Sequence, residues 1–326
     1  MYIFSNIFSR GEYFLIDYLE KVGNFNSSYV DSIFAVEGYY DLYNFSKEEL
    51  SGAVGASTNS RRKTHGRLDD KTRTYDFIFI PNNGFLNSNL PLMTDCELKL
   101  SFDRVNAEVA LVENGGSVTT DSSGSPLVLK DVIAIAEYTT SDELQTYFMK
   151  IDHNPIPYYY QECDVTLKSL PQDETIIRLD NIKGGNTPTC LFAAIIPAAA
   201  LNGDMEQSST AFDHHNVTEF NITLNGNSVN GFPMEVKSPV LPYYQFMDVT
   251  SRYMNPACGD GLKMSQFMHS WIYAHKFEAE VSSQGWLGIN LKLSTAFSKP
   301  HTLVIWCIND CALTIDKFHQ IEKLNL

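Results

Sequence analysis

The chain has 326 residues, of which 44% are hydrophobic and 19% charged, and this balance is that of a globular protein rather than a disordered one. Its formal net charge of −15 repels phosphate, so strong direct binding to a nucleic acid backbone is not expected. No run of about 18 apolar residues occurs, so the sequence predicts no membrane span. Residues 1–10 lack a basic start and a small-residue cleavage site, so we expect no secretion signal and a protein that is intracellular or inside an assembled particle.

The cysteines and glycosylation motifs fit this compartment. In a long chain without a secretion signal, scattered cysteines are expected to be reduced and mostly buried. They stand at positions 96, 163, 190, 258, 307 and 311. The N-x-S/T motifs at Asn26, Asn44, Asn216 and Asn221 carry no meaning without secretion.

The first half of the chain predicts short strands separated by polar loops. Strands are expected within residues 2–20 and 98–112 and at 75–80 and 132–138, with short helices within 29–43 and from Thr140 to Lys150. A long polar loop is expected from Gly52 to Asp70 and another from Glu113 to Ser125. The first loop contains Arg61, Arg62 and Lys63 and could contact anions, although a solvated loop is the simpler explanation.

A domain boundary is predicted near residues 152–157. Pro155 and Pro157 stiffen this segment and prevent a helix there. After it, strands are expected again at 165–170, 175–179, 190–196 and 216–224, with Asn225-Gly226 as a hairpin turn and a returning strand at 229–236. Residues 239–253 are expected to be amphipathic and partly helical. We therefore divide the chain into residues 1–152 and 153–326.

The last fifty residues predict two long strands. Between Trp286 and Ser294 the side chains alternate, which places Leu287, Ile289, Leu291 and Leu293 on one face. The apolar run 302–308 fits a strand covered on both faces, and 312–315 adds a short strand or an extension. We expect these strands to form a hairpin through the turn at Lys299-Pro300, with Val304 and Trp306 buried.

Neither half shows strands that alternate regularly with long helices, which disfavours a parallel α/β fold. Two all-β halves remain, each with about seven or eight strands and short helices in the loops. The predicted fold class is therefore all-β, with two tandem antiparallel jelly rolls.

No catalytic, cofactor-binding or metal-binding constellation is expected. A jelly-roll metalloenzyme needs His-x-His or His-x-Asp on one strand, since alternate residues share a face. The adjacent His214 and His215 would point to opposite faces, and His269 and His275 are isolated. Cys307 and Cys311 have no second pair, so core packing explains them better than a zinc site.

Several segments resemble the hexon-like double-jelly-roll major capsid proteins of Polinton/Maverick elements and adintoviruses. The hairpin at 216–232, with its Leu-Asn-Gly turn and the following Pro233, resembles a hairpin of that family. Residues 163–170 and 177–182 resemble the opening strands of its second roll, and 270–310 resemble the closing strands. In the first half, 6–15 and 77–86 resemble family segments more loosely.

This resemblance implies a structural subunit of the virion and not an enzyme. Three copies would form a pseudo-hexameric capsomer of an icosahedral capsid, in contact with neighbouring capsomers, penton proteins and minor capsid proteins. Family members have strands before the segment that matches residues 6–15. Either the reading frame starts here at an internal methionine, or the first roll lacks its opening strands and has exposed edges.

An alternative is a jelly-roll module that binds carbohydrate or another ligand. The aromatic segments Tyr158–Tyr160 and Tyr39–Tyr40 could stack on sugars, although packing near the domain boundary explains them more simply. The size of the protein in solution separates the two functions, because a strict monomer would favour the binding module over the capsid subunit.

Overall fold

The computed structural model describes most of the second half of the chain and isolated parts of the first. The described residues are 155–202, 212, 214–250, 264–268, 271–277, 285–316, 318 and 321–325, together with 2–4, 19, 66–69, 72–75, 97–99, 133, 141–142, 146 and 149. The helix predicted within 29–43, Tyr39–Tyr40, His269 and the loop at 113–125 lie outside these residues.

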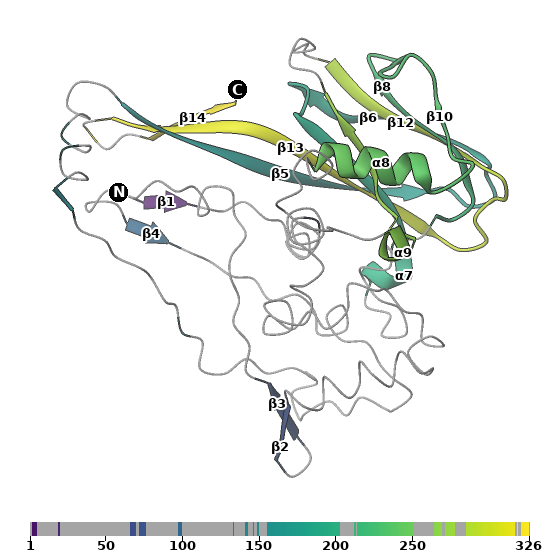
Figure 1. Ribbon diagram of the computed structural model, residues 1–326, viewed down its shortest axis with the longest axis horizontal. Coiled ribbons are helices and arrows are strands. Elements are labelled where there is room, and N and C mark those ends of the chain that lie inside the picture. The colour runs from purple at the N-terminus through teal and green to yellow at the C-terminus, as the bar shows by residue number, and fades with distance from the viewer. Residues whose placement is uncertain are drawn as a thin grey trace.

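The second half folds into two facing antiparallel sheets (Figure 1). In one sheet the order is β5, β13, β7 and β11, and these strands span Ile156–Leu170, His301–Ile315, Cys190–Pro197 and Tyr273–Lys276. In the other the order is β6, β12, β8 and β10, and these strands span Ile176–Gly185, Gly285–Leu293, Val217–Leu224 and Met234–Glu235. The short β9 (Asn227–Ser228) pairs with β8, and β14 (Ile321–Asn325) pairs with the end of β13.

The strand order defines a jelly roll. When the eight main strands are counted along the chain, the two sheets have the orders 1-8-3-6 and 2-7-4-5. Consecutive strands therefore cross repeatedly between the sheets, as in the double-sheet jelly rolls built from Greek keys. The all-β prediction is confirmed, and residues 156–315 contain one jelly roll.

The hairpin predicted for the last two strands is wrong. β12 pairs with β6 and β8, whereas β13 pairs with β5 and β7 in the opposite sheet. The connection at residues 294–300 crosses the end of the sandwich instead of making a tight turn. Both strands have an apolar face to bury, and they bury these faces against each other across the sandwich rather than side by side.

The interior of the sandwich follows the alternation of β12. Leu287, Ile289, Leu291 and Leu293 are all buried, as predicted. Phe220 of β8 and Tyr273 of β11 stack across the two sheets, with ring centroids 4.2 Å apart. Because Tyr273 faces inward, its ladder neighbours Ala193 and Ile305 face inward too.

The outer face of β13 and β7 is covered as well, which explains the continuous apolar run at 302–307. Trp306 is fully buried and makes an edge contact with Phe212, with ring centroids 5.6 Å apart. Next to it, Phe192 contacts Phe246 of α8 (Val240–Val249), and α8 lies beside β11. The two short helices α7 (Ala198–Leu201) and α9 (Met264–Phe267) complete this layer in the described region.

The Asn225-Gly226 turn is confirmed. Both residues have positive φ, 53° and 82°, as a tight hairpin turn of this type requires. The returning strand predicted at 229–236 is wrong as a continuous element, because the chain after the turn pairs with β8 only in two short pieces, β9 and β10. Residues 229–233 between them include Gly231, with φ of 76°, and Pro233, which cannot donate a ladder hydrogen bond.

β5 and β13 are longer than predicted and extend beyond the sandwich as a two-stranded arm (Figure 1). β7 accompanies β13 only as far as Ile308, and β14 pairs with residues 311–315. Pro157, which was expected in the domain boundary, lies inside β5. The only strand described as pairing with β5 is β13, and an edge strand tolerates proline because one side of its ladder is unpaired.

The described parts of the first half partly match the predictions. Asp142, Thr146 and Met149 are helical, as expected for the helix from Thr140. β2 (Gly66–Asp69) and β3 (Thr72–Tyr75) form a hairpin that begins inside the predicted loop. β1 (Tyr2–Phe4) pairs with β4 (Glu97–Lys99) in parallel, and Ile133 lies outside regular structure rather than in a strand. None of the described helices is long and apolar enough to span a membrane.

Candidate functional site

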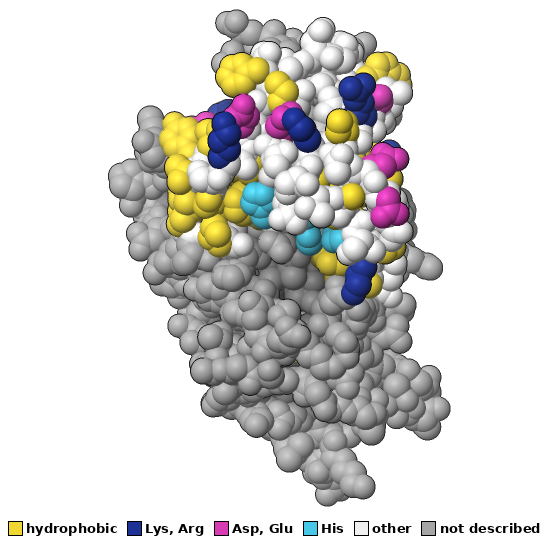
Figure 2. Space-filling model, turned by 90° about the vertical axis from the view of Figure 1, so that its right-hand side faces the viewer, with side chains coloured by type: hydrophobic (Ala, Val, Ile, Leu, Met, Phe, Trp, Pro, Cys, Tyr) yellow, Lys and Arg dark blue, Asp and Glu magenta, His cyan; other side chains and the backbone are white. Residues whose placement is uncertain are grey.

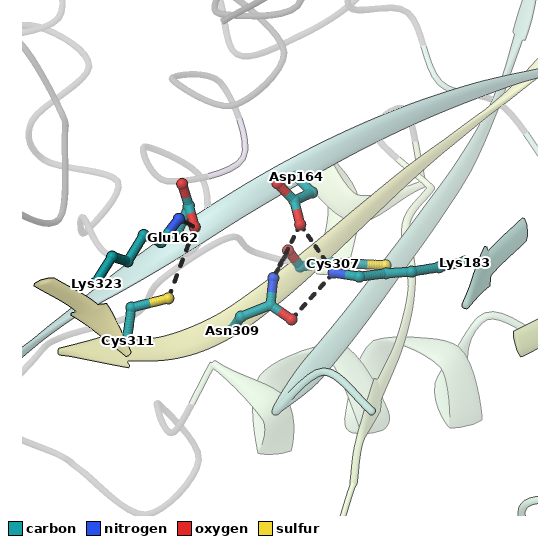
Figure 3. A network of polar contacts seen from close by, with 7 residues as sticks. All are labelled: Glu162, Asp164, Lys183, Cys307, Asn309, Cys311 and Lys323. Atoms are coloured by element: carbon teal, nitrogen blue, oxygen red, sulfur yellow. Dashed lines mark hydrogen bonds and ion pairs between the residues drawn. The ribbon is translucent and has the colours of Figure 1, made fainter. Parts of the chain in front are cut away.

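A polar network joins the two sheets at the end of the sandwich where the arm begins (Figure 3). Lys183 of β6 lies 2.8 Å from Asp164 Oδ2 of β5 and donates to Asn309 Oδ1 of β13 at 3.0 Å. The Asn309 amide donates to the same Asp164 oxygen at 3.1 Å. One cation from one sheet is thus held by two strands of the other.

The position of this network follows from where the apolar alternation ends. The inward face of β13 carries Leu303, Ile305 and Cys307, which are buried, and then Asn309, which is half-buried. Lys183 pairs with the inward-facing Leu287, so its side chain enters the space between the sheets. The Lys183 side chain is 21% exposed and that of Asp164 52%, so solvent screens this pair and its energy is modest.

A second polar cluster lies further along the arm. Glu162 of β5 accepts from Lys323 of β14 at 2.5 Å and from the Cys311 thiol of β13 at 3.6 Å. Burial raises the pKa of Cys311 to about 11, and the Glu162 carboxylate adds to this effect. Burial opposes the charge of Lys323, but the hydrogen bond and charge of Glu162 outweigh it and raise the Lys323 pKa. The thiol is therefore neutral and a poor nucleophile at ordinary pH.

Between these clusters the surface is hollowed to about 450 Å³. Its lining is polar and comes from the arm, from β14, from the end of β6 and from the loop between β6 and β7. The lining residues are Glu162, Asp164, Lys183, Gly184, Gly185, Asn186, Thr187, Thr189, Asn309, Asp310 and Lys323. Asp310 is held by Thr189 at 2.8 Å and by Gln161 at 3.0 Å. The charged side chains of this lining are hydrogen-bonded to one another or to neutral polar groups, which holds the polar surface of the hollow in place.

The histidines are placed among aromatic rings. His214 packs on Trp271, with ring centroids 4.4 Å apart, while His215 lies 4.6 Å from the ring of His301. The adjacent pair lies before β8 and not in a strand, and its two rings face different partners. His275 contacts Phe277, and burial lowers its pKa. Among the described residues no three His, Cys, Asp or Glu side chains are grouped as metal ligands would be.

The cysteines follow the core-packing prediction at the positions that the structure describes. Cys307 and Cys311 are 1% exposed, and Cys163 and Cys190 are half-buried. All four are free thiols. Burial raises the pKa of Cys190 and of Cys307 to about 11.

The tyrosines at 158–160 belong to β5 and not to a linker. Tyr158 is fully buried, Tyr159 is 63% exposed and Tyr160 is half-buried, because neighbouring residues of a strand alternate between its faces. They do not form a common aromatic surface. The sequence interpretation also missed Lys183, because it ended the strand at residue 179. β6 continues to Gly185 past a bulge opposite Gly288, which interrupts the alternation on which the sequence interpretation relied.

The outer surface of α8 is apolar. Pro242, Phe246 and Val249 are buried, whereas Val240, Leu241 and Tyr244 are 60%, 44% and 47% exposed. The amphipathic helix expected here therefore has an apolar outer side as well. Figure 2 shows hydrophobic side chains gathered toward one side of the sandwich, with charges of both signs interspersed over the rest.

The jelly roll places the described half in a large structural class that includes viral capsid and lectin domains. Neither a protein-family model nor a curated protein sequence matches the chain. Among solved structures, the chain is similar to one in the cryo-EM structure of the Sputnik virophage, with 15% identity, a TM-score of 0.34 and coverage of 52% of this chain and 39% of that chain.

Two further solved structures are similar at the same level. The mavirus major capsid protein has 8% identity and a TM-score of 0.32, with 52% of this chain and 41% of that chain covered. A crystal structure of PBCV-1 VP54 has 11% identity and a TM-score of 0.35, with 56% and 54% covered. The chain spans about two fifths of the length of the first two proteins. The jelly-roll assignment rests on the strand order and register of this chain.

Proposed function

We propose that this protein is a hexon-like major capsid subunit of a DNA virus or of a virus-derived element of the Polinton/Maverick and adintovirus type. The observation that carries the proposal is the jelly-roll strand order at 156–315, in the same residues whose strands and Asn-Gly turn resemble that family. The protein acts by assembly in the virion and not by catalysis. Its partners are other capsid proteins.

A second jelly roll is proposed for residues 1–152, packed against the arm of β5 and β13. Its support is the burial of Tyr158, Cys311, Ala312 and Ile315, which are at most 2% exposed although they lie on the arm beyond the end of β7. An arm of β5, β13 and β14 alone in solvent would leave these side chains exposed to water. Two rolls per chain would give a subunit shaped as two adjoining wedges.

Three such subunits would close a pseudo-hexagonal ring through head-to-tail contacts. The apolar outer surface of α8 is the best-supported contact surface among the described residues, because obligate interfaces are richer in apolar groups than ordinary surface. Each contact is expected to bury about 2,000 Å² or more. With a net charge of −15, the capsid would need a separate basic protein to condense its genome.

The test is the mass of the full chain in solution, expressed with any coding sequence that precedes Met1. At micromolar concentration and moderate salt we expect a trimer by sedimentation equilibrium and a three-fold particle by electron microscopy. A strictly monomeric species would overturn the capsid proposal. The double variant Val240→Lys/Leu241→Lys should weaken the trimer, whereas Phe232→Lys, at a residue that is 72% exposed and outside α8, should not.

A further inference from the structure

We propose that Trp286 and the polar groups around it form a binding site for a neutral sugar on the outer face of the β6–β12–β8 sheet. Trp286 is 59% exposed, whereas the other two tryptophans, Trp271 and Trp306, are 1% and 0% exposed. Its neighbours along the strand, Leu287 and Ile289, face the interior, so the indole belongs to the opposite, outer face. Nothing in the capsid proposal requires a large aromatic ring in solvent at this position.

The sheet supports the indole as a flat platform. Gly184 of β6 stands directly across from Trp286 in the ladder. A Cβ atom on Gly184 would lie within 3.0 Å of three atoms of the six-membered ring, so the ring extends over the glycine and occupies the place of its side chain. One side of the ring therefore lies toward the sheet, and exposed indole surface remains for a ligand. Exposed, fixed aromatic surface is suited to stacking on the C–H face of a pyranose.

Hydrogen-bonding groups surround this platform. On the β8 side, Asn225 accepts from the Trp286 backbone N–H at 2.9 Å, which fixes its exposed carboxamide next to the Trp286 backbone. Gly288 lies two residues after Trp286 on β12. Asp180 Oδ1 of β6 and Thr223 Oγ1 of β8 lie within 3.5 Å of the position that a Cβ on Gly288 would take. A carboxylate and an amide next to an aromatic ring are complementary to sugar hydroxyls, which both donate and accept.

The charges around the ring select the class of ligand. The exposed Asp180 carboxylate and the overall negative charge repel phosphate and acidic sugars, which disfavours nucleotides and sialylated glycans. A protein partner centred on Trp286 would need apolar or water-excluding neighbours. Here the groups on the flanking strands are small or polar: Gly184 lies across from Trp286 on β6, Asn225 bonds its backbone on the β8 side, and Asp180 and Thr223 lie against Gly288. A neutral hexose or N-acetylhexosamine fits this combination.

The experiment uses the full chain and four neutral disaccharides: N,N′-diacetylchitobiose, lactose, maltose and mannobiose. Saturation-transfer NMR should detect binding of at least one of them. The same sugar should protect the fluorescence of Trp286 from acrylamide, because the other two tryptophans are buried. 3′-Sialyllactose should bind at least about tenfold more weakly. Failure of all four disaccharides to bind the wild-type protein would overturn the proposal.

Variants distinguish a sugar site from a subunit contact. Trp286→Ala should lower the affinity for the sugar by at least about tenfold, which is the scale of one lost aromatic stacking contact. Trp286→Phe should restore part of this affinity. Gly184→Ala should weaken binding by displacing the ring, whereas Phe232→Ala, at another exposed aromatic residue, should have no effect. If Trp286→Ala leaves sugar binding unchanged, or instead dissociates the oligomer, the ring is not a sugar platform. The mass of the wild-type oligomer is measured separately, so failure here leaves the capsid proposal intact.

Discussion

Phe220 and Tyr273 lie in different sheets, and their rings stack at 4.2 Å with an interplanar angle of 5°. Both side chains are at most 3% exposed. This contact fixes the separation of the sheets at the side of the sandwich where β8 and β11 face each other.

Phe220→Ala should lower the free energy of unfolding by about 3–5 kcal/mol, because it removes a buried ring and leaves a cavity between the sheets. Phe220→Leu should cost less, since much of the volume is kept. Denaturant unfolding followed by circular dichroism measures both. Equal costs for the two variants would contradict a packed contact at this position.

Trp306→Ala should also cost about 3–5 kcal/mol, since the ring is fully buried between β13 and Phe212. Trp286→Ala is the matched control, because it removes the same side chain from an exposed position and should change stability by only about 0.5 kcal/mol. Comparable losses of stability in the two variants would contradict the assignment of Trp306 to the core.

Lys183 and Asp164 should be coupled by about 0.5–1 kcal/mol in a double-mutant cycle with alanine, measured from denaturant unfolding. The coupling should fall as salt rises, since Asp164 is about half exposed. The pair Lys292 and Glu219 on the outer face is the control. Lys292 is far more exposed than Lys183, and among the described contacts this pair has no third residue that bonds to both partners, as Asn309 does for Lys183 and Asp164. A larger coupling for the control pair would contradict the role of Lys183 in joining the sheets.

The buried thiols should make the protein less stable in alkali. The pKa values of Cys307 and Cys311 rise from the ordinary 9.0 to about 11, so the unfolded chain releases these protons first. Their contribution to stability is complete below about pH 9 and is lost as pH rises toward about 11. Unfolding free energies from pH 8 to 10.5 should fall more steeply for the wild type than for Cys307→Ala/Cys311→Ala. In native protein at pH 8 both thiols should react slowly with Ellman's reagent, and they should react quickly after unfolding.

Local patterns in the sequence determined which residues form strands and which sides of them are buried. The alternation at 286–294 placed Leu287, Ile289 and Leu291 inside and, by the same parity, Trp286 outside. The Asn225-Gly226 dipeptide determined a hairpin turn, because few other residues adopt positive φ at both positions. The continuous apolar run ending at Ile308 indicated a strand covered on both faces.

Tertiary structure alone decided which strands pair and which polar groups meet. The alternation of β12 and the continuous apolar run of β13 are compatible both with a hairpin and with two strands that face each other from two sheets, so only the closure of the sandwich could choose between these arrangements. Lys183, Asp164 and Asn309 lie up to 145 residues apart, and nothing local to any of them indicates the others. Their contact depends on the register of three strands in two sheets, which is set by the packing of the whole core.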